Sequence, residues 1–330
     1  LVARHGFAAR VALTHPLPAS DPARRELRSG GLGATVALGL FALLLAGVLL
    51  SGTVLFFVAV VLVATGRIRP RMPRPAPGGS VYLESFALFT GGFLFVQILA
   101  GLLDALTRTP DGESAPWAPA VGLGLQWSLL LIPFWPLVRH RFSPRLEGMH
   151  AQRFAGTVGL HRGRGFWREV GAGVLGYLAG VPVFVAGIAL TLVLVTVWTS
   201  LTGGDSQTPA NPLFDLIAGA DPLMIALIVL LATVWAPLCE ELIFRGGLYR
   251  HLRSRLPIPI AAVVSAAVFA FMHGYGPLFA FPVMALGFNF ALIREWRGSL
   301  IGCITAHALH NGTIMLLLIT MVTTLDLTSP

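Results

Sequence analysis

Two adjacent glutamates follow a long apolar run in the C-terminal half of the chain. Glu240 and Glu241 come directly after residues 223–239, and Arg245 lies four positions beyond Glu241. On a helix Glu241 and Arg245 can form an ion pair, whereas Glu240 points about 100° away from Glu241. Because charged groups in a membrane segment cost about 2.5–3.5 kcal/mol each, they are expected to have a function. A partly dehydrated carboxylate holds a proton more tightly than one in water, so Glu240 is a candidate general base.

The segment Glu240–Arg245 also fits a simpler structure, in which a helix ends at the membrane surface with a solvated cluster of charges. Two further polar groups argue against it. His273 ends the apolar stretch Phe269-Ala-Phe-Met-His273, and His307 precedes Asn311 by four residues, so those two side chains share one helix face. His310 lies beside Asn311 and is expected to be a bystander.

The spacing of these groups around the expected turns places them at one depth. Glu240 lies 16 residues before Leu256, and His273 lies 16 residues after Pro257. An antiparallel helix hairpin that reverses there brings Glu240 and His273 to the same level. His307 follows Arg297 by 10 residues, or about 15 Å of helix, which lets it reach that level. We therefore expect Glu240, His273 and His307 to lie close together.

Metal and thiol chemistry are the alternatives for these residue types. Carboxylates, histidines and Cys303, four residues before His307, can all ligate zinc. The zinc motif His-Glu-x-x-His is missing from the sequence, so we expect no cofactor and keep a zinc site as the alternative. Cys239 and Cys303 both lie in apolar segments, which favours small packing residues over nucleophiles.

The segments that carry these residues are typical of a polytopic membrane protein. Of 330 residues, 55% are apolar and 12% are charged, compared with about 45–50% and about 25% in soluble domains. Runs of about 20 apolar residues can cross a hydrocarbon core about 30 Å thick. The sequence thus predicts an all-α membrane protein with about eight transmembrane helices and a polar catalytic cavity in its C-terminal half. The runs cover residues 34–65, 81–106, 117–138, 170–201, 223–244, 258–272, 278–293 and 300–325.

The chain divides into three parts on this basis. Residues 1–33 form an Arg- and Pro-rich tail, expected to be disordered or to lie on the membrane surface. Residues 34–201 hold the N-terminal transmembrane helices, and residues 223–325 the catalytic membrane domain. The tail and the run after it are too long for the parts of a signal peptide, so we expect no cleavage. The run 34–65 fits either two short passes or one long helix.

Arginine distribution predicts the orientation. The net charge is +8, every basic residue is arginine, and most arginines lie between apolar runs, which favours topology over nucleic-acid binding. Alternate loops carry them, at 67–74, 139–168, 250–255 and 294–297, whereas the loop with Asp205, Asp215 and Asp221 has none. By the positive-inside rule the arginine-rich side is cytoplasmic. We expect a multi-pass protein of a bacterial plasma membrane whose active site opens toward that side.

The three motifs together resemble a known family. Glu240-Glu241-x-x-x-Arg245, Phe269-x-x-x-His273 and His307-x-x-x-Asn311 are similar to the motifs of the CAAX-protease and bacteriocin-processing family (CPBP, or Abi) of intramembrane proteases, which includes the Rce1 prenyl-protein endopeptidases. The sequence around the motifs is also similar to that of the family, from Glu240 to Leu248 and from Arg297 to Leu300. The resemblance covers roughly residues 223–314, about a quarter of the chain.

The resemblance implies a role for each motif residue. Glu240 would be the general base, and His273 would help it to hold the attacking water. His307 and Asn311 would stabilise the oxyanion, a contribution of about 3–4 kcal/mol for each donor. Glu241 and Arg245 would support the helix.

The resemblance further implies a membrane-associated peptide or protein as substrate, met in the lipid bilayer. Eukaryotic members act on prenylated CAAX tails, whereas bacterial members are linked to bacteriocin or peptide processing, immunity and secretion. A non-enzymatic membrane protein, such as an immunity factor, a scaffold or a transporter, is the remaining alternative. A transporter is disfavoured because neither inverted repeats nor paired broken helices are visible.

Overall fold

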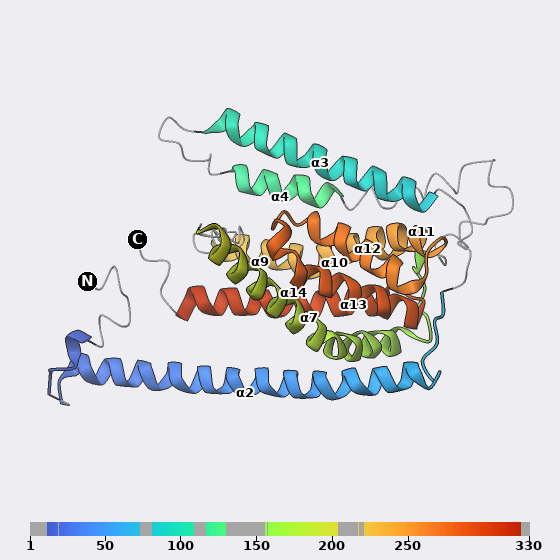
Figure 1. Cartoon of the computed structure of the whole chain (residues 1–330). Coiled ribbons are helices and arrows are strands. Elements are labelled where there is room, and N and C mark those ends of the chain that lie inside the picture. Colours follow the sequence, from blue (N-terminus) through green and yellow to red (C-terminus); the bar gives the residue numbers. More distant parts are fainter. Residues whose placement is uncertain are drawn as a thin grey trace.

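The computed structural model describes residues 12–18, 20–72, 81–108, 117–129, 156, 158–203, 217 and 221–324. Within these ranges the regular elements are all helices, with no strand (Figure 1). Each of the eight apolar runs overlaps a helical segment. The parts of those runs at 130–138 and 325, and the loop residues 139–155 and 205–216, lie outside the described ranges.

Five helices in the described ranges are long and apolar enough to cross a membrane: Gly39–Ala64, Val81–Thr107, Phe166–Thr202, Pro222–Arg253 and Ile301–Thr320. The described part of the chain is therefore all-helical, and its five apolar helices are those of a multi-pass membrane protein. The helices α12 (Ile258–Phe271) and α13 (Phe281–Arg297) have 14 and 17 residues. At 1.5 Å per residue, α12 is about 21 Å long, which is less than a hydrocarbon core. The predicted count of eight spans stays a prediction.

The first long helix, α2, runs unbroken over Pro22–Ala64. The run 34–65 therefore forms one helix and not two passes, and the helix begins well before the boundary predicted at residue 34. Its start has a local cause: the Asp21 carboxylate accepts a hydrogen bond from Ala23 N, and Pro22 occupies the first turn, where a missing N–H costs nothing. The helix packs along α7 (Phe166–Thr202), and its apolar surface is otherwise largely exposed.

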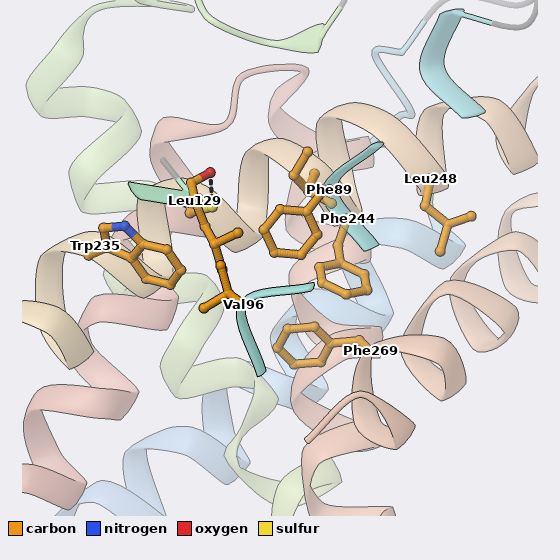
Figure 2. Close-up of a cluster of buried hydrophobic side chains, with 9 residues drawn as sticks. Phe89, Val96, Leu129, Trp235, Phe244, Leu248 and Phe269 are labelled. Carbon is orange, nitrogen blue, oxygen red and sulfur yellow. Dashed lines mark hydrogen bonds between the residues drawn. The ribbon is translucent and has the colours of Figure 1, made fainter. Parts of the chain in front are cut away.

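Helices α3 (Val81–Thr107) and α4 (Ala118–Ser128) lie on the side of the molecule opposite α2 (Figure 1). They meet the C-terminal helices through a cluster of buried apolar side chains (Figure 2). Phe89 and Val96 of α3 and Leu129 after α4 pack there against Trp235, Phe244 and Phe269. Trp235 Nε1 also donates to the carbonyl of Trp127, which ties the end of α4 to the central helix.

The central helix over residues 222–253 is not a uniform α-helix. The α-helical segments α9 (Pro222–Leu230), α10 (Ala236–Glu241) and α11 (Tyr249–Arg253) alternate with the π-helical segments η3 (Leu231–Trp235) and η4 (Leu242–Leu248). Both glutamates thus end a short α-helical piece with a π-helical turn on each side. Such turns are rare, and they often occur at functional sites.

A glycine pair explains how neighbouring chain segments reach η4. A Cβ on Gly246 would lie 3.0 Å from the carbonyl oxygen of Val158, and one on Gly247 would lie 3.3 Å from that of Tyr82. Both separations are tighter than ordinary van der Waals contact, so a larger side chain at either position would push a carbonyl group away. The start of α3 and the segment before α7 can therefore pack directly on the helix that carries Glu240.

Helices α12 and α13 form a hairpin in which α13 packs against α7, and α14 (Ile301–Thr324) packs against both α7 and α13. The described parts of the four arginine-rich loops meet at one end of this assembly. Arg71 N donates to the carbonyl of Glu295, whose carboxylate pairs with Arg253. Arg297 forms two hydrogen bonds of 2.8 Å with the buried Glu169 carboxylate. Since α2 ends here, its N-terminal end lies at the opposite end of the bundle (Figure 1).

Candidate active site

Three of the predicted residues converge from three helices. Glu240 is the last residue but one of α10, His273 follows α12, and His307 lies in α14. Glu240 Oε2 is 4.0 Å from His273 Nε2 and 3.9 Å from His307 Nε2. This oxygen is buried and has no hydrogen-bond partner among the residues that the structure describes. The separations are too long for direct hydrogen bonds but fit a bridging water. The expected proximity is therefore present.

His273 presents a specific nitrogen to Glu240. Its Nδ1 lies 2.8 Å from the carbonyl oxygen of Phe269, one turn earlier in the chain. A carbonyl oxygen can only accept, so Nδ1 carries the proton in this contact. In the neutral imidazole the lone pair then belongs to Nε2, the nitrogen that faces Glu240. His273 can accordingly accept a hydrogen from a water held between them.

Glu241 holds two partners at once. Its Oε1 accepts from Arg245 at 2.8 Å, the ion pair that the four-residue spacing predicts. The same oxygen lies 2.9 Å from His307 Nδ1. Because a carboxylate accepts, Nδ1 donates and Nε2 of His307 is left facing Glu240. The sequence indicated the first contact but not the second, which joins residues 66 positions apart.

Arg245 forms the centre of the supporting structure. It is completely buried, donates to the carbonyl of Gly287 on α13 at 3.0 Å, and lies 4.4 Å over the ring of Phe269 and 5.1 Å over that of Phe290. The Phe290 ring in turn stacks on His307 with 5.1 Å between centroids. Arg245 thus orders the aromatic rings that border both histidines, in addition to neutralising Glu241.

Asn311 makes a contact that its position in the sequence did not suggest. Its Nδ2 donates to the carbonyl oxygen of Ala232 in η3 at 2.8 Å. The two residues that would ordinarily reach this oxygen do not supply a hydrogen there, because Ala236 N donates to Leu231 and Pro237 has no N–H. Asn311 therefore supplies the donor that the π-helical turn lacks. The Asn311 amide carries a second hydrogen beyond the one donated to Ala232.

The comparison with protein families identifies the segment of the chain that carries this site. Residues 222–313 match the family model described as Type II CAAX prenyl endopeptidase Rce1-like. Residues 222–313 form an Rce1-like domain. The match confirms the resemblance, and it implies a protease. Neither the comparison with curated proteins nor that with solved structures gives a significant match.

All six motif residues lie inside the Rce1-like domain, and the structure brings five of them into one connected group. Glu240, His273, His307, Glu241 and Arg245 are linked by the contacts above, and Asn311 is joined to the group through α14. His310 faces elsewhere: its ring meets Phe184 at 5.2 Å and Tyr177 at 6.1 Å, both on α7. It packs α14 against α7.

The two cysteines of the Rce1-like domain contact backbone carbonyl groups. Cys239 and Cys303 are free thiols and fully buried. Cys303 Sγ lies 3.3 Å from the carbonyl oxygen of Phe290, and Cys239 Sγ lies 3.9 Å from that of Leu129. Among the described residues no group of three or more His, Cys, Asp and Glu side chains is arranged to hold a metal ion. The expectations about zinc and about thiol chemistry remain to be tested by experiment.

Proposed function

We propose that this protein is an intramembrane endopeptidase in which Glu240 activates a water molecule. The observation that carries the proposal is the buried Glu240 Oε2, which lacks a hydrogen-bond partner among the described residues and faces two imidazole nitrogens about 4 Å away. A buried carboxylate oxygen is costly to leave unsatisfied. A water that bridges Glu240 and the two imidazoles would satisfy this oxygen and would be held by the base that activates it.

The steps follow from the hydrogen-bonding capacity of each group. Glu240 takes one proton from the water. The remaining O–H donates a hydrogen bond to His273 Nε2, which holds the oxygen in place. The hydroxide bonds to the carbonyl carbon of the scissile peptide, and the carbonyl oxygen becomes an oxyanion. When this intermediate collapses, the C–N bond breaks, and Glu240 returns its proton to the leaving amine.

Two donors are available for the oxyanion. His307, when protonated, has an Nε2–H that points toward Glu240, since its Nδ1–H is used by Glu241. Asn311 has one amide hydrogen beyond the one that binds Ala232. Donors fixed by other contacts before the reaction stabilise the developing charge without reorganising. In this proposal Glu241 and Arg245 keep the two histidines in place.

The substrate class follows from the depth of the site. Glu240 lies 13 residues from Arg253, or about 20 Å along the helix axis. A peptide must therefore reach into the membrane domain, which favours a membrane-associated peptide or protein. We place the protein in a bacterial plasma membrane with the arginine-rich end and the access to the site on the cytoplasmic side. The reaction as proposed needs no cofactor, and a zinc-dependent reaction is the alternative.

The test is cleavage by the purified full chain in lipid nanodiscs. The probes are a fluorescence-quenched peptide ending in a farnesylated CAAX sequence and the same peptide carried on a plain acyl anchor. Glu240→Gln should abolish cleavage and leave the protein folded, because an amide cannot take the proton but nearly preserves the shape. Glu84→Gln makes the same chemical change on α3 and serves as the matched control.

The membrane peptides of cells that express each variant extend the test to natural substrates. A peptide product that appears with the wild-type chain and the Glu84→Gln control, but not with Glu240→Gln, supports the proposal. Cleavage by Glu240→Gln at the wild-type rate would show that the base is assigned wrongly. A non-enzymatic immunity factor or scaffold predicts no product from any variant and a cellular role that survives Glu240→Gln.

A further inference from the structure

The turn after His273 brings one aromatic side chain back over the site. Gly274 and Gly276, on either side of Tyr275, have φ values of +74° and +76°. This left-handed conformation is readily adopted only by glycine among the common residues. Two such residues in a row of three reverse the chain tightly enough for Tyr275 to return onto the residue two positions before it.

The ring of Tyr275 lies nearly parallel to the imidazole of His273, with 6.1 Å between centroids and 19° between planes. Phe269 meets the same imidazole edge-on at 4.7 Å, and its carbonyl receives the Nδ1 hydrogen. Two of the three contacts that orient His273 thus come from Phe269 within α12. The third comes from Tyr275, and it limits rotation of a side chain that is still 31% exposed.

Tyr275 also lies within electrostatic reach of the proposed base. Burial, together with the nearby charge of Glu240, raises the pKa of the Tyr275 phenol, which therefore stays neutral over the range in which enzymes work. A neutral ring can stack on the imidazole without adding a charge beside Glu240. Tyr275 is therefore close to both Glu240 and His273 and belongs to the candidate active site.

We propose that Tyr275 is a positioning residue that holds the His273 imidazole in the plane in which Nε2 faces the water of Glu240. This inference rests on the proposed function. It assigns the effect to the aromatic ring and not to the hydroxyl, because the observed contact is an offset, nearly parallel arrangement of the two rings. Without the stack His273 can turn about its χ angles and withdraw Nε2 from the water.

The test compares Tyr275→Phe, which keeps a stacking ring, with Tyr275→Leu, which keeps bulk but cannot stack. Cleavage of the quenched acylated peptide is measured in nanodiscs as kcat and KM over a range of pH. Tyr275→Leu should lower kcat about ten- to a hundred-fold with little change in KM, since a misplaced catalytic group slows the chemical step. Tyr275→Phe should retain the wild-type kcat, because it keeps the ring beside His273.

Each other outcome overturns the inference. If Tyr275→Phe loses as much rate as Tyr275→Leu, the hydroxyl acts and the stack does not. If Tyr275→Leu keeps the wild-type kcat, the contact is incidental. Tyr275→Trp, which also stacks, replaces Tyr275→Leu as the informative variant if the latter fails to fold, and it must then retain kcat. The proposed function fails separately, through cleavage by Glu240→Gln with Tyr275 intact.

Discussion

The carboxylate of Glu241 binds His307 across two helices, 2.9 Å from Nδ1, with the same oxygen that binds Arg245. A residue that looked purely structural from its spacing therefore also orients a proposed oxyanion donor. Glu241 and Arg245 are both fully buried. The Glu241 carboxylate therefore both neutralises the buried Arg245 cation and orients His307.

Glu241→Gln should reduce both stability and cleavage. The amide leaves the Arg245 cation without its counterion, at about 3–5 kcal/mol, and weakens the hold on His307. The double variant Glu241→Gln with Arg245→Met removes both charges and should recover much of the stability, because buried ion pairs can be replaced by apolar groups at little cost. Its cleavage rate should stay low, since His307 still lacks a carboxylate. Thermal unfolding and initial rates separate the two effects; full recovery of rate would contradict the second role of Glu241.

Asn311 and Pro237 should be energetically coupled. Asn311→Ala leaves the Ala232 carbonyl without its donor, which should cost about 1–3 kcal/mol of stability. Pro237→Ala returns a backbone N–H to the turn, so Asn311→Ala should cost clearly less in that background. Unfolding midpoints of the four proteins give the coupling energy. Strictly additive effects would mean that Asn311 does not compensate for the proline.

The two ends of the bundle should label from opposite sides of the membrane. Cysteines introduced by Arg162→Cys and Arg255→Cys should be protected from a membrane-impermeant reagent in intact cells, because the proposed topology puts the arginine-rich end in the cytoplasm. Ser20→Cys should react, because one unbroken α2 that crosses the membrane once would put Ser20 on the opposite side. The native Cys239 and Cys303 are buried, so they give a low background. Labelling of Arg255→Cys from outside would reverse the orientation, and equal behaviour of Ser20→Cys and Arg162→Cys would contradict a single crossing.

Chelators should leave cleavage by the wild-type chain essentially unchanged under the glutamate mechanism. Purified protein is incubated with a strong chelator, assayed with the quenched peptides, and analysed for bound metal. A zinc enzyme would lose activity and regain it when zinc is added back. Reversible loss and recovery would replace the glutamate mechanism by the zinc alternative.

Much of the architecture was determined by the sequence itself. Hydropathy identified the membrane class and the approximate position of each helix, because length and apolar composition alone decide whether a helix can cross lipid. The Glu241–Arg245 pair was equally predictable, since residues four apart are neighbours on a helix whatever surrounds it. The equal residue counts around Pro257 anticipated that Glu240 and His273 lie together, as antiparallel helices of equal rise reach equal depth.

Only the tertiary structure decided which faces meet. The π-helical turns η3 and η4 insert extra residues into the helical repeat, which rotates Glu241 relative to the faces that a regular period predicts. The Glu241–His307 and Asn311–Ala232 contacts, and the return of Tyr275 onto His273, depend on such rotations and on a turn with two left-handed glycines. The unbroken course of α2 could be known only from the structure. A run of 32 apolar residues is compatible by length and hydropathy with one long helix or with two short ones.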